Sequence, residues 1–194
     1  MAGNPAKIGK RIVCLPQLRD CYARKSPFKA VDNREVFNIT THEERLVGWR
    51  EWVAIPALNL PAIKAKVDTG ARTSALHAFY LEPFSVNGVE RIRFGVHPVQ
   101  RRKDIVVECE ADILDRRAVT DSGGHRETRY TIEVEILLGG EQWPIEMTLT
   151  DRDTMQFRML LGRTALRGRT LVDPTRSYRT GRRKRADIVR IYTN

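Results

Sequence analysis

The chain has 194 residues and a formal net charge of +10, from 34 basic and 24 acidic side chains. Its 41% hydrophobic and 30% charged residues can supply a core of ordinary size, which excludes a wholly disordered chain. No apolar stretch approaches the roughly 20 residues needed to cross a bilayer, and the first apolar run, residues 12–15, is too short for a secretory signal. We therefore expect a cytoplasmic protein with no membrane partner.

The positive charge is confined to the two ends of the chain. Residues 1–45 hold nine basic and five acidic side chains, residues 46–175 hold 18 of each, and residues 176–194 hold seven basic side chains and one acidic. We therefore predict a basic N-terminal arm (1–45), a central domain (46–175) and a basic C-terminal tail (176–194). The two ends are either solvated or bind polyanions, because clustered Lys and Arg release counterions on binding.

Strand patterns begin after the N-terminal arm. Residues 62–67 alternate between apolar and polar side chains, which is typical of a half-buried strand. Further on, Asn87-Gly88 and Gly139-Gly140 each separate two apolar runs, and such pairs favour tight hairpin turns. We predict hairpins over residues 84–94 and 131–149.

The remaining predicted elements are one more strand, at residues 105–107, and a single helical turn at residues 164–167. Many short strands with turn residues between them are typical of a β-sandwich or a small barrel. The sequence therefore predicts an all-β domain with one short helix.

The sharpest motif is Asp68-Thr69-Gly70-Ala71, which ends the alternating strand. A catalytic carboxylate needs a rigid edge to project from, and glycine allows the backbone to turn closely behind it. The triplet alone would also suit any tight turn. A second motif, Leu161-Gly162-Arg163, follows more than 90 residues later and immediately precedes the predicted helical turn.

Together the two motifs resemble the retropepsin pattern, in which apolar residues and Gly-Arg pack behind a catalytic turn. Residues 66–78, with further matches between residues 149 and 174, resemble a bacterial retropepsin-like family. That family carries an older label as an ATP-dependent zinc protease and is linked with the RimK-type ATP-grasp ligase, which adds glutamates to a ribosomal protein. The resemblance covers residues 46–175.

The resemblance implies an acid-protease closed barrel with a flap hairpin and one catalytic residue per chain, Asp68. Thr69, Gly70 and Ala71 would form the active-site turn, and Leu161, Gly162 and Arg163 its structural support. A single carboxylate cannot both activate water and protonate the carbonyl, so the enzyme would be a homodimer in which two Asp68 side chains share a proton. The activity implied is that of an aspartic endopeptidase.

The sequence departs from the retroviral pattern two positions after Gly70. Where an acidic residue commonly pairs with the Arg of Gly-Arg, this chain has Arg72. Arg163 must then find another acid, for which Asp153 and Asp173 are candidates. Arg72 would face the cleft and favour an acidic, glutamate-rich substrate, a polyglutamate tail among them, since guanidinium binds carboxylates in a bidentate manner.

Residues 113–130 are predicted to form the flap, a hairpin that closes over the substrate. Gly123-Gly124 would form its tip, and Arg117 and Arg129 would flank the substrate, although solvated strand charges explain these arginines equally well. His77 is a further substrate-binding candidate, with a structural role as the alternative. Asp121-Ser122-Gly123 resembles a second catalytic triplet, but no full apolar strand precedes it.

No cofactor is predicted. The chain has three scattered cysteines and no His-Glu-x-x-His sequence, and no phosphate-binding glycine-rich loop supports ATP dependence. A different class of function remains open at this point: a non-catalytic module whose basic arms dock on RNA, the ribosome or an acidic protein.

Overall fold

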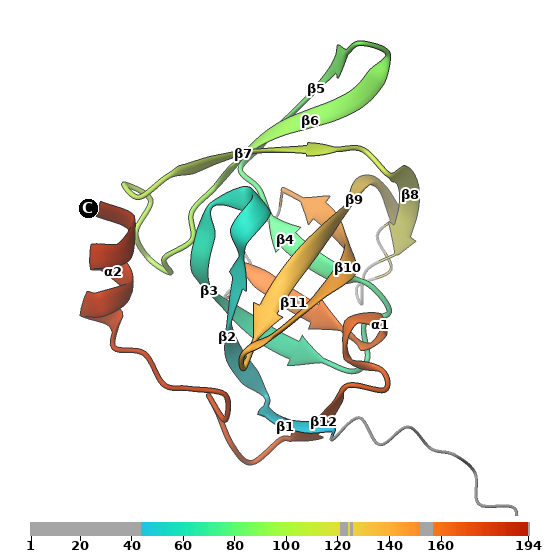
Figure 1. The fold of residues 1–194 in the computed structure, drawn as a ribbon. Helices are drawn as coiled ribbons and strands as arrows, with labels where there is room; N and C mark the ends of the chain where they lie inside the picture. Colours follow the sequence, from blue (N-terminus) through green and yellow to red (C-terminus); the bar gives the residue numbers. More distant parts are fainter. Residues whose placement is uncertain (1–43, 121–123, 125, 152–156, 194) are drawn as a thin grey trace, which may run out of the picture. The chain divides into compact units, whose positions relative to one another are not determined.

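The structure, a computed structural model, describes residues 44–120, 124, 126–151 and 157–193 (Figure 1). The N-terminal arm predicted at residues 1–45 therefore lies almost entirely outside the described residues. The first strand, β1 (Arg45–Gly48), begins within one residue of the predicted start of the domain. Among the described residues, no helix is long and apolar enough to cross a membrane.

The main sheet closes on itself. Its strand order is β10-β4-β11-β3-β2-β9-β8, and β10 also pairs with β9, so that six strands form a ring and β8 extends it (Figure 1). This closed ring is the all-β architecture that the resemblance implies. The strands are β2 (Arg50–Ile55), β3 (Leu60–Asp68), β4 (Ser74–His77), β8 (Asp115–Thr120), β9 (Arg126–Leu138), β10 (Glu141–Thr150) and β11 (Met159–Gly162).

Both predicted hairpins are confirmed. They could be predicted because the residues of each turn determine its conformation locally. The pair β5 (Tyr80–Val86) and β6 (Val89–Val96) turns at Asn87 and Gly88, with φ of 52° and 81°. The pair β9 and β10 turns at Gly139 and Gly140, with φ of 60° and 91°. Two successive positive φ angles are the signature of the type I′ turn, which matches the twist of a hairpin.

The third strand of the β5–β6 sheet lies later than predicted. It is β7 (Val107–Asp112), whereas Ile105, which we predicted to lie in a strand, is buried in the preceding loop. Ile105 belongs instead to a small cluster with Ala62, Val99 and Ile188, under the C-terminal part of the chain.

The core fills the ring with the inward-facing residues of the alternating strands. The largest fully buried side chains include Ile63 of β3, Ile132 and Ile136 of β9, and Met147 and Leu149 of β10. Trp143 of β10 also packs in the core: it is 3% exposed, and its indole N–H donates to the carbonyl of Ala165 at 3.0 Å.

The helices are short. A 3₁₀ turn, η1 (Pro56–Leu58), links β2 to β3, and α1 (Arg163–Leu166) forms the predicted helical turn after β11. The chain then continues into β12 (Thr170–Asp173), which pairs in parallel with β1.

The C-terminal segment contains a helix that the sequence did not predict. We expected residues 176–194 to form a tail beyond the domain, but α2 (Arg185–Thr193) lies beside the ring of strands (Figure 1). Its Ile188 is fully buried in a cluster with Ala62 of β3. The Tyr192 hydroxyl donates to the carbonyl of Ala62 at 2.8 Å and accepts from the amide N–H of Ala62 at 3.2 Å. Two side chains of α2 that carry no charge, Ile188 and Tyr192, therefore help to dock the tail.

Buried Glu51 fastens the segment before α2. Its carboxylate has no exposed surface and accepts hydrogen bonds from the amide N–H groups of Gly48, Arg179 and Thr180 and from the Thr180 hydroxyl. These contacts hold residues 179–180 against β2. Arg182 and Arg183, which follow directly, are therefore kept at the surface of the domain.

Candidate active site

Asp68 is the last residue of β3, where the strand turns sharply. Its Oδ1 atom accepts hydrogen bonds from the amide N–H groups of Gly70 at 3.1 Å and Ala71 at 3.2 Å. Its Oδ2 atom accepts one from the Lys66 ammonium at 3.2 Å, and the side chain is 26% exposed. The carboxylate is thus fixed by its own turn and remains open to solvent.

The surroundings of Asp68 favour its ionised form. Burial raises the pKa of Asp68, but the hydrogen bond and charge of Lys66, together with the amide N–H groups of Ala71 and Gly70, outweigh burial and lower the pKa overall. In a single chain the carboxylate is therefore a ready base at neutral pH.

The loop after Asp68 is supported by β11, which runs parallel to β3 with Gly162 beside Asp68 and Leu161 beside Val67. A Cβ atom on Gly162 would lie 2.5 Å from the carbonyl carbon of Thr73 and 2.7 Å from its oxygen, so only glycine fits. The amide N–H of Gly162 donates to the Ser74 hydroxyl at 3.1 Å, which joins β11 to the end of the loop.

The carbonyl groups of the loop are bound by the start of α1. The amide N–H of Arg163 donates to Ala71 at 2.9 Å, and the Thr164 amide and hydroxyl donate to Arg72 at 3.1 and 2.9 Å. The Arg163 guanidinium donates to the carbonyl of Gly70 at 3.4 Å. Every carbonyl from Gly70 to Arg72 therefore has a donor from α1.

Arg163 does not use the acid that we expected from the sequence. The prediction of Asp173 is wrong, because the Asp173 carboxylate accepts from the Thr175 amide and hydroxyl. Asp153, the other candidate, lies outside the described residues. Arg163 thus supports the turn through a backbone carbonyl, a partner that a search for charge pairs does not consider.

Arg72 is exposed and is linked electrostatically to the flap. The flap's Arg117 donates to both Glu146 of β10 and Asp115 of β8. The hydrogen bond from Arg117 is the main cause of the lowered pKa of Glu146, and the charge of Arg72 lowers this pKa further. Two arginines that we predicted to bind substrate thus both lower the pKa of Glu146.

The remaining flap residues divide into described and undescribed ones. Arg129 lies opposite Arg117 in the β8–β9 hairpin, but its side chain is only 9% exposed and pairs with Glu127 at 2.7 Å. Gly124 has a φ of 84°, as a tip residue requires, whereas Gly123 lies outside the described residues, with Asp121 and Ser122. The described hairpin agrees in position with the predicted flap.

His77 lies in β4 and has no exposed surface. It cannot reach a substrate in this structure, so our prediction of a substrate contact is not supported, and a structural role fits the position better.

Two residues of the site were missed in the sequence. The first is Lys66, which precedes Asp68 by two positions on one strand. Their side chains therefore share a face, and the alternation of residues 62–67 could have shown this. Glu146 carried no such local signal, because its neighbour Arg117 is 29 residues away in the chain. No group of three or more His, Cys, Asp or Glu side chains suited to a metal ion occurs in the part of the chain that the structure describes.

A carboxylate fixed by a tight turn, a Gly-Arg loop packed behind it and a hairpin beside a closed ring of strands define the retropepsin-like class of fold. Over residues 46–183 the sequence matches the RimB-like family, described as "retropepsin-like aspartic endopeptidase RimB". The chain belongs to this family.

Curated relatives carry a different name. A "probable alpha-L-glutamate ligase" of Shewanella halifaxensis (strain HAW-EB4) is 46% identical over 147 residues, and one of Parasynechococcus marenigrum (strain WH8102) is 48% identical. In both cases the match covers 76% of this chain but 32% of the relative, so the chain spans about a third of the length of these proteins.

A solved structure shares the fold. A Legionella pneumophila protein described as of unknown function (DUF785) aligns with a TM-score of 0.60 at 26% identity, over 70% of this chain and 98% of that chain.

Proposed function

We propose that the protein is an aspartic peptidase that hydrolyses glutamate-rich peptides, and that its catalytic dyad consists of Asp68 from each of two chains. The observation that carries this proposal is the geometry of Asp68: a partly exposed carboxylate, locked by two amide N–H groups at the end of a core strand. A structural aspartate in a turn would not require the glycine-only packing behind it.

In the proposed mechanism the two carboxylates divide the work. Like charges about 3 Å apart cannot both ionise, so one Asp68 is protonated while the other is a base. The base removes a proton from water as the water oxygen attacks the peptide carbonyl carbon, and the acid protonates the carbonyl oxygen. The tetrahedral intermediate then breaks its C–N bond as a proton passes to the leaving nitrogen.

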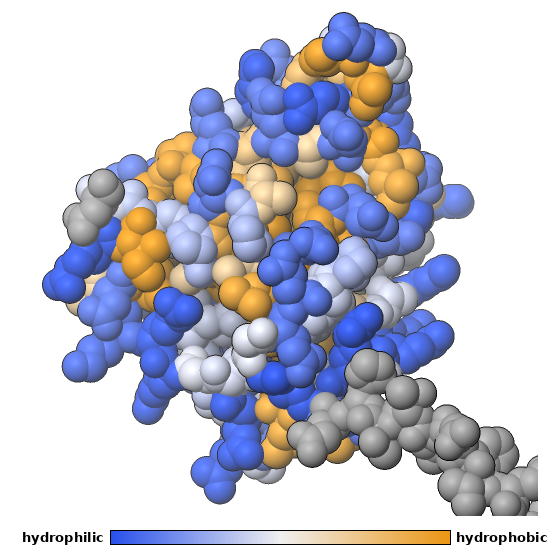
Figure 2. All heavy atoms as spheres, in the orientation of Figure 1, coloured by the Kyte–Doolittle hydropathy of each residue, from blue (hydrophilic) through white to orange (hydrophobic). Residues whose placement is uncertain are grey.

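Exposed apolar side chains of the two-stranded β1–β12 sheet are an argument for the proposed dimer. Leu46 and Leu171 lie directly opposite each other and are 39% and 52% exposed. Figure 2 shows hydrophobic surface over these strands, at the bottom of the view, within a largely hydrophilic face. The sheet leads into the site, since the carbonyl of Trp49 accepts from the amide N–H of Val67, next to Asp68.

Two arguments support an acidic substrate. Arg72 is exposed beside the turn, and Arg117 of the flap hairpin and Arg72 both lower the pKa of the same carboxylate, Glu146. In addition, the relatives named as glutamate ligases contain a segment like this chain within a protein about three times as long. A domain joined to such a ligase would meet glutamate-rich chains.

The test is incubation of the wild type and Asp68→Asn with poly-α-glutamate and with a neutral peptide, followed by mass spectrometry. We expect cleavage by the wild type, with a preference for poly-α-glutamate, and none by Asp68→Asn. Cleavage that survives in Asp68→Asn would refute the role of Asp68.

A second arm tests the dimer. Mixing the wild type with an excess of Asp68→Asn should suppress activity, because most active chains would then pair with an inactive one. Activity proportional to the wild-type chains alone would contradict a shared dyad.

A further inference from the structure

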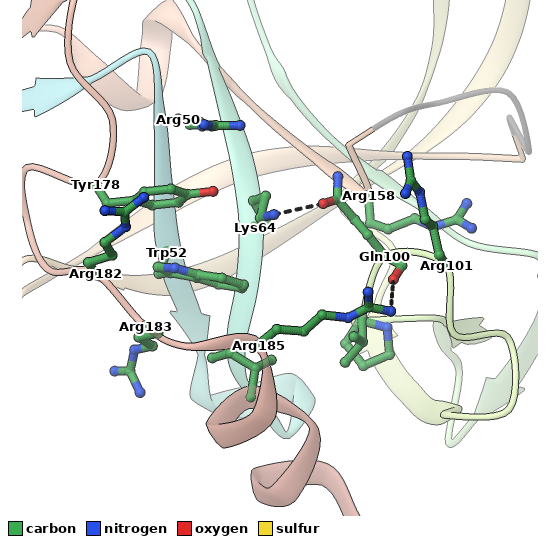
Figure 3. A pocket seen from close by; sticks show the side chains of 13 residues that line it. Arg50, Trp52, Lys64, Gln100, Arg101, Arg158, Tyr178, Arg182, Arg183 and Arg185 are labelled. Atoms are coloured by element: carbon green, nitrogen blue, oxygen red, sulfur yellow. Dashed lines mark hydrogen bonds between the residues drawn. The ribbon is translucent and has the colours of Figure 1, made fainter.

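One cavity lined by described residues is strongly cationic. It has a volume of about 570 Å³ and is lined by 13 residues, none of which is acidic (Figure 3). Its basic side chains come from β2, β3, the loop after β6, the residue before β11 and the C-terminal segment: Arg50, Lys64, Arg101, Arg158, Arg182, Arg183 and Arg185. We call this cavity the basic pocket.

The pocket is held together by the fold. Arg158 is 8% exposed, Lys64 donates to the Gln100 side chain at 2.8 Å, and Arg185 donates to the carbonyl of Gln100 at 3.4 Å (Figure 3). Arg182 and Arg183 are exposed at its rim and are placed there by the contacts of Glu51 and α2. The C-terminal charges are therefore part of a binding surface.

The two aromatic rings of the pocket are engaged within the protein. Trp52 and Tyr178 stack with their centroids 5.9 Å apart, the Lys64 ammonium lies 5.4 Å from the Trp52 ring, and the Arg50 guanidinium lies 5.1 Å from the Tyr178 ring. The rings hold cations in place through cation–π contacts. The pocket therefore suits a chain of anionic groups better than a nucleobase, which would require an open ring face.

The pocket and Asp68 lie on one face of the sheet. Lys64, Lys66 and Asp68 alternate along β3, and Arg50 and Trp52 of β2 lie directly opposite Lys66 and Lys64. From Lys64 to Asp68 the strand rises about 13 Å, at roughly 3.3 Å per residue. Side chains on one face of an extended peptide repeat at the same spacing, so an acidic peptide could present a carboxylate to each lysine.

We propose that the basic pocket is an exosite that binds the distal part of an acidic peptide whose scissile bond lies at Asp68. The inference rests on the proposed peptidase function for its choice of ligand. Lys66 and Lys64 form the path from the cleft, and the rim arginines bind carboxylates four or more residues away from the bond that is cleaved. The exosite makes binding depend on the length of the acidic run.

The test uses Asp68→Asn, which cannot turn the peptide over, and measures the Kd of α-linked triglutamate and decaglutamate by calorimetry. The pocket variant adds Arg182→Ala and Arg183→Ala. The control adds Arg167→Ala and Arg190→Ala, which remove the same charge from exposed positions outside the pocket. Thermal unfolding verifies that both variants fold.

We expect decaglutamate to bind at least tenfold more tightly than triglutamate. The pocket variant should lose about tenfold in affinity for decaglutamate and the control less than twofold, with the affinity for triglutamate unchanged in both. Equal affinity for the two peptides, or equal losses in the two variants, would overturn the exosite. Tighter pocket-dependent binding of a ten-unit polyphosphate would also overturn it, in favour of a phosphate site.

The same experiment separates the two proposals. If the chain with Asp68 intact cleaves neither peptide while the length-dependent binding persists, the peptidase proposal fails and the basic pocket stands as a binding site for long acidic peptides. If it cleaves triglutamate and decaglutamate with the same kcat/KM, and if Arg182→Ala with Arg183→Ala in the chain with Asp68 intact is equally active, the exosite fails and the peptidase stands.

Discussion

The Lys66 ammonium lies 3.2 Å from the Asp68 carboxylate, so the proposed catalytic base carries its own counter-ion within the same chain. This contact has a direct consequence for the pH at which a dyad would work. A nearby cation favours the charged form of a carboxylate, and here it helps to lower the pKa of Asp68.

Lys66→Met should move the pH–rate profile to higher pH. Without the ammonium, the pKa of Asp68 rises, so both apparent pKa values of the dyad rise with it. The base then ionises, and the acid remains protonated, at higher pH than in the wild type. The measurement is the pH dependence of kcat/KM on a neutral peptide.

Lys64→Met is the control for this prediction. It removes the same charge from the same face of β3, but Lys64 donates to Gln100 and has no contact with Asp68. Its profile on a neutral peptide should match that of the wild type. A shift of equal size in both variants would indicate a general effect of charge, and a shift to lower pH in Lys66→Met would contradict the assigned role.

Glu146→Gln should improve the use of acidic peptides. The Glu146 carboxylate binds Arg117, and the charge of Arg72 also lowers the pKa of Glu146. Glu146 therefore competes with a substrate carboxylate for these two arginines. Neutralising it should lower the KM for poly-α-glutamate by roughly twofold to fivefold, the size of one surface ion pair. Activity on a neutral peptide should change by less than about twofold.

A matched variant is Glu135→Gln, which removes one exposed negative charge from the neighbouring strand, away from both arginines. Its KM for poly-α-glutamate should stay close to that of the wild type. If the two variants behave alike, Glu146 has no specific role; a higher KM in Glu146→Gln would show that it orients Arg117 for binding.

Local sequence rules predicted the elements whose conformation is decided locally. The turns at Asn87-Gly88 and Gly139-Gly140, and the strand that ends at Asp68, depend on residue type and period alone. Closure of the ring depends on pairings between distant segments, such as β11 with β3, and was expected only from the resemblance to a family.

The C-terminal helix could not be predicted in this way. Residues 185–193 are short and rich in charge, and the helix is stabilised by one buried side chain, Ile188, and by hydrogen bonds between Tyr192 and Ala62, 130 residues earlier. The same limit applies to Arg163, whose partner is a backbone carbonyl, and to Glu51, whose partners are mostly amide N–H groups. Backbone carbonyl and N–H groups are the same at nearly every position, so the sequence does not show which of them a side chain will bind.

Glu51→Gln should destabilise the protein and free the C-terminal segment. All the partners of Glu51 are donors, so a glutamine would place its own NH₂ group against buried N–H groups. Leaving such groups without an acceptor costs about 2–3 kcal/mol. Urea unfolding should show this loss, and trypsin should cleave faster after Arg182 and Arg183.

The control for this change is Glu82→Gln, at an exposed position in β5. It should alter stability by less than about 0.5 kcal/mol and leave the rate of tryptic cleavage unchanged. Faster cleavage without a loss of stability in Glu51→Gln would mean that the segment is docked independently of the core.

Gly162→Ala tests the packing behind Asp68. The added methyl group would meet the Thr73 carbonyl group at 2.5–2.7 Å, and this backbone belongs to the loop that follows Asp68. We expect a loss of about 3 kcal/mol or more in the free energy of unfolding, because the clash is with backbone in a packed core.

Gly88→Ala is the matched variant: its φ of 81° strains an alanine, but nothing lies within 4 Å of the new atom. It should cost about 1–2 kcal/mol. If urea midpoints show that Gly162→Ala is no worse than Gly88→Ala, the loop after Asp68 is not clamped by β11, and the rigid turn on which the proposed dyad depends is lost.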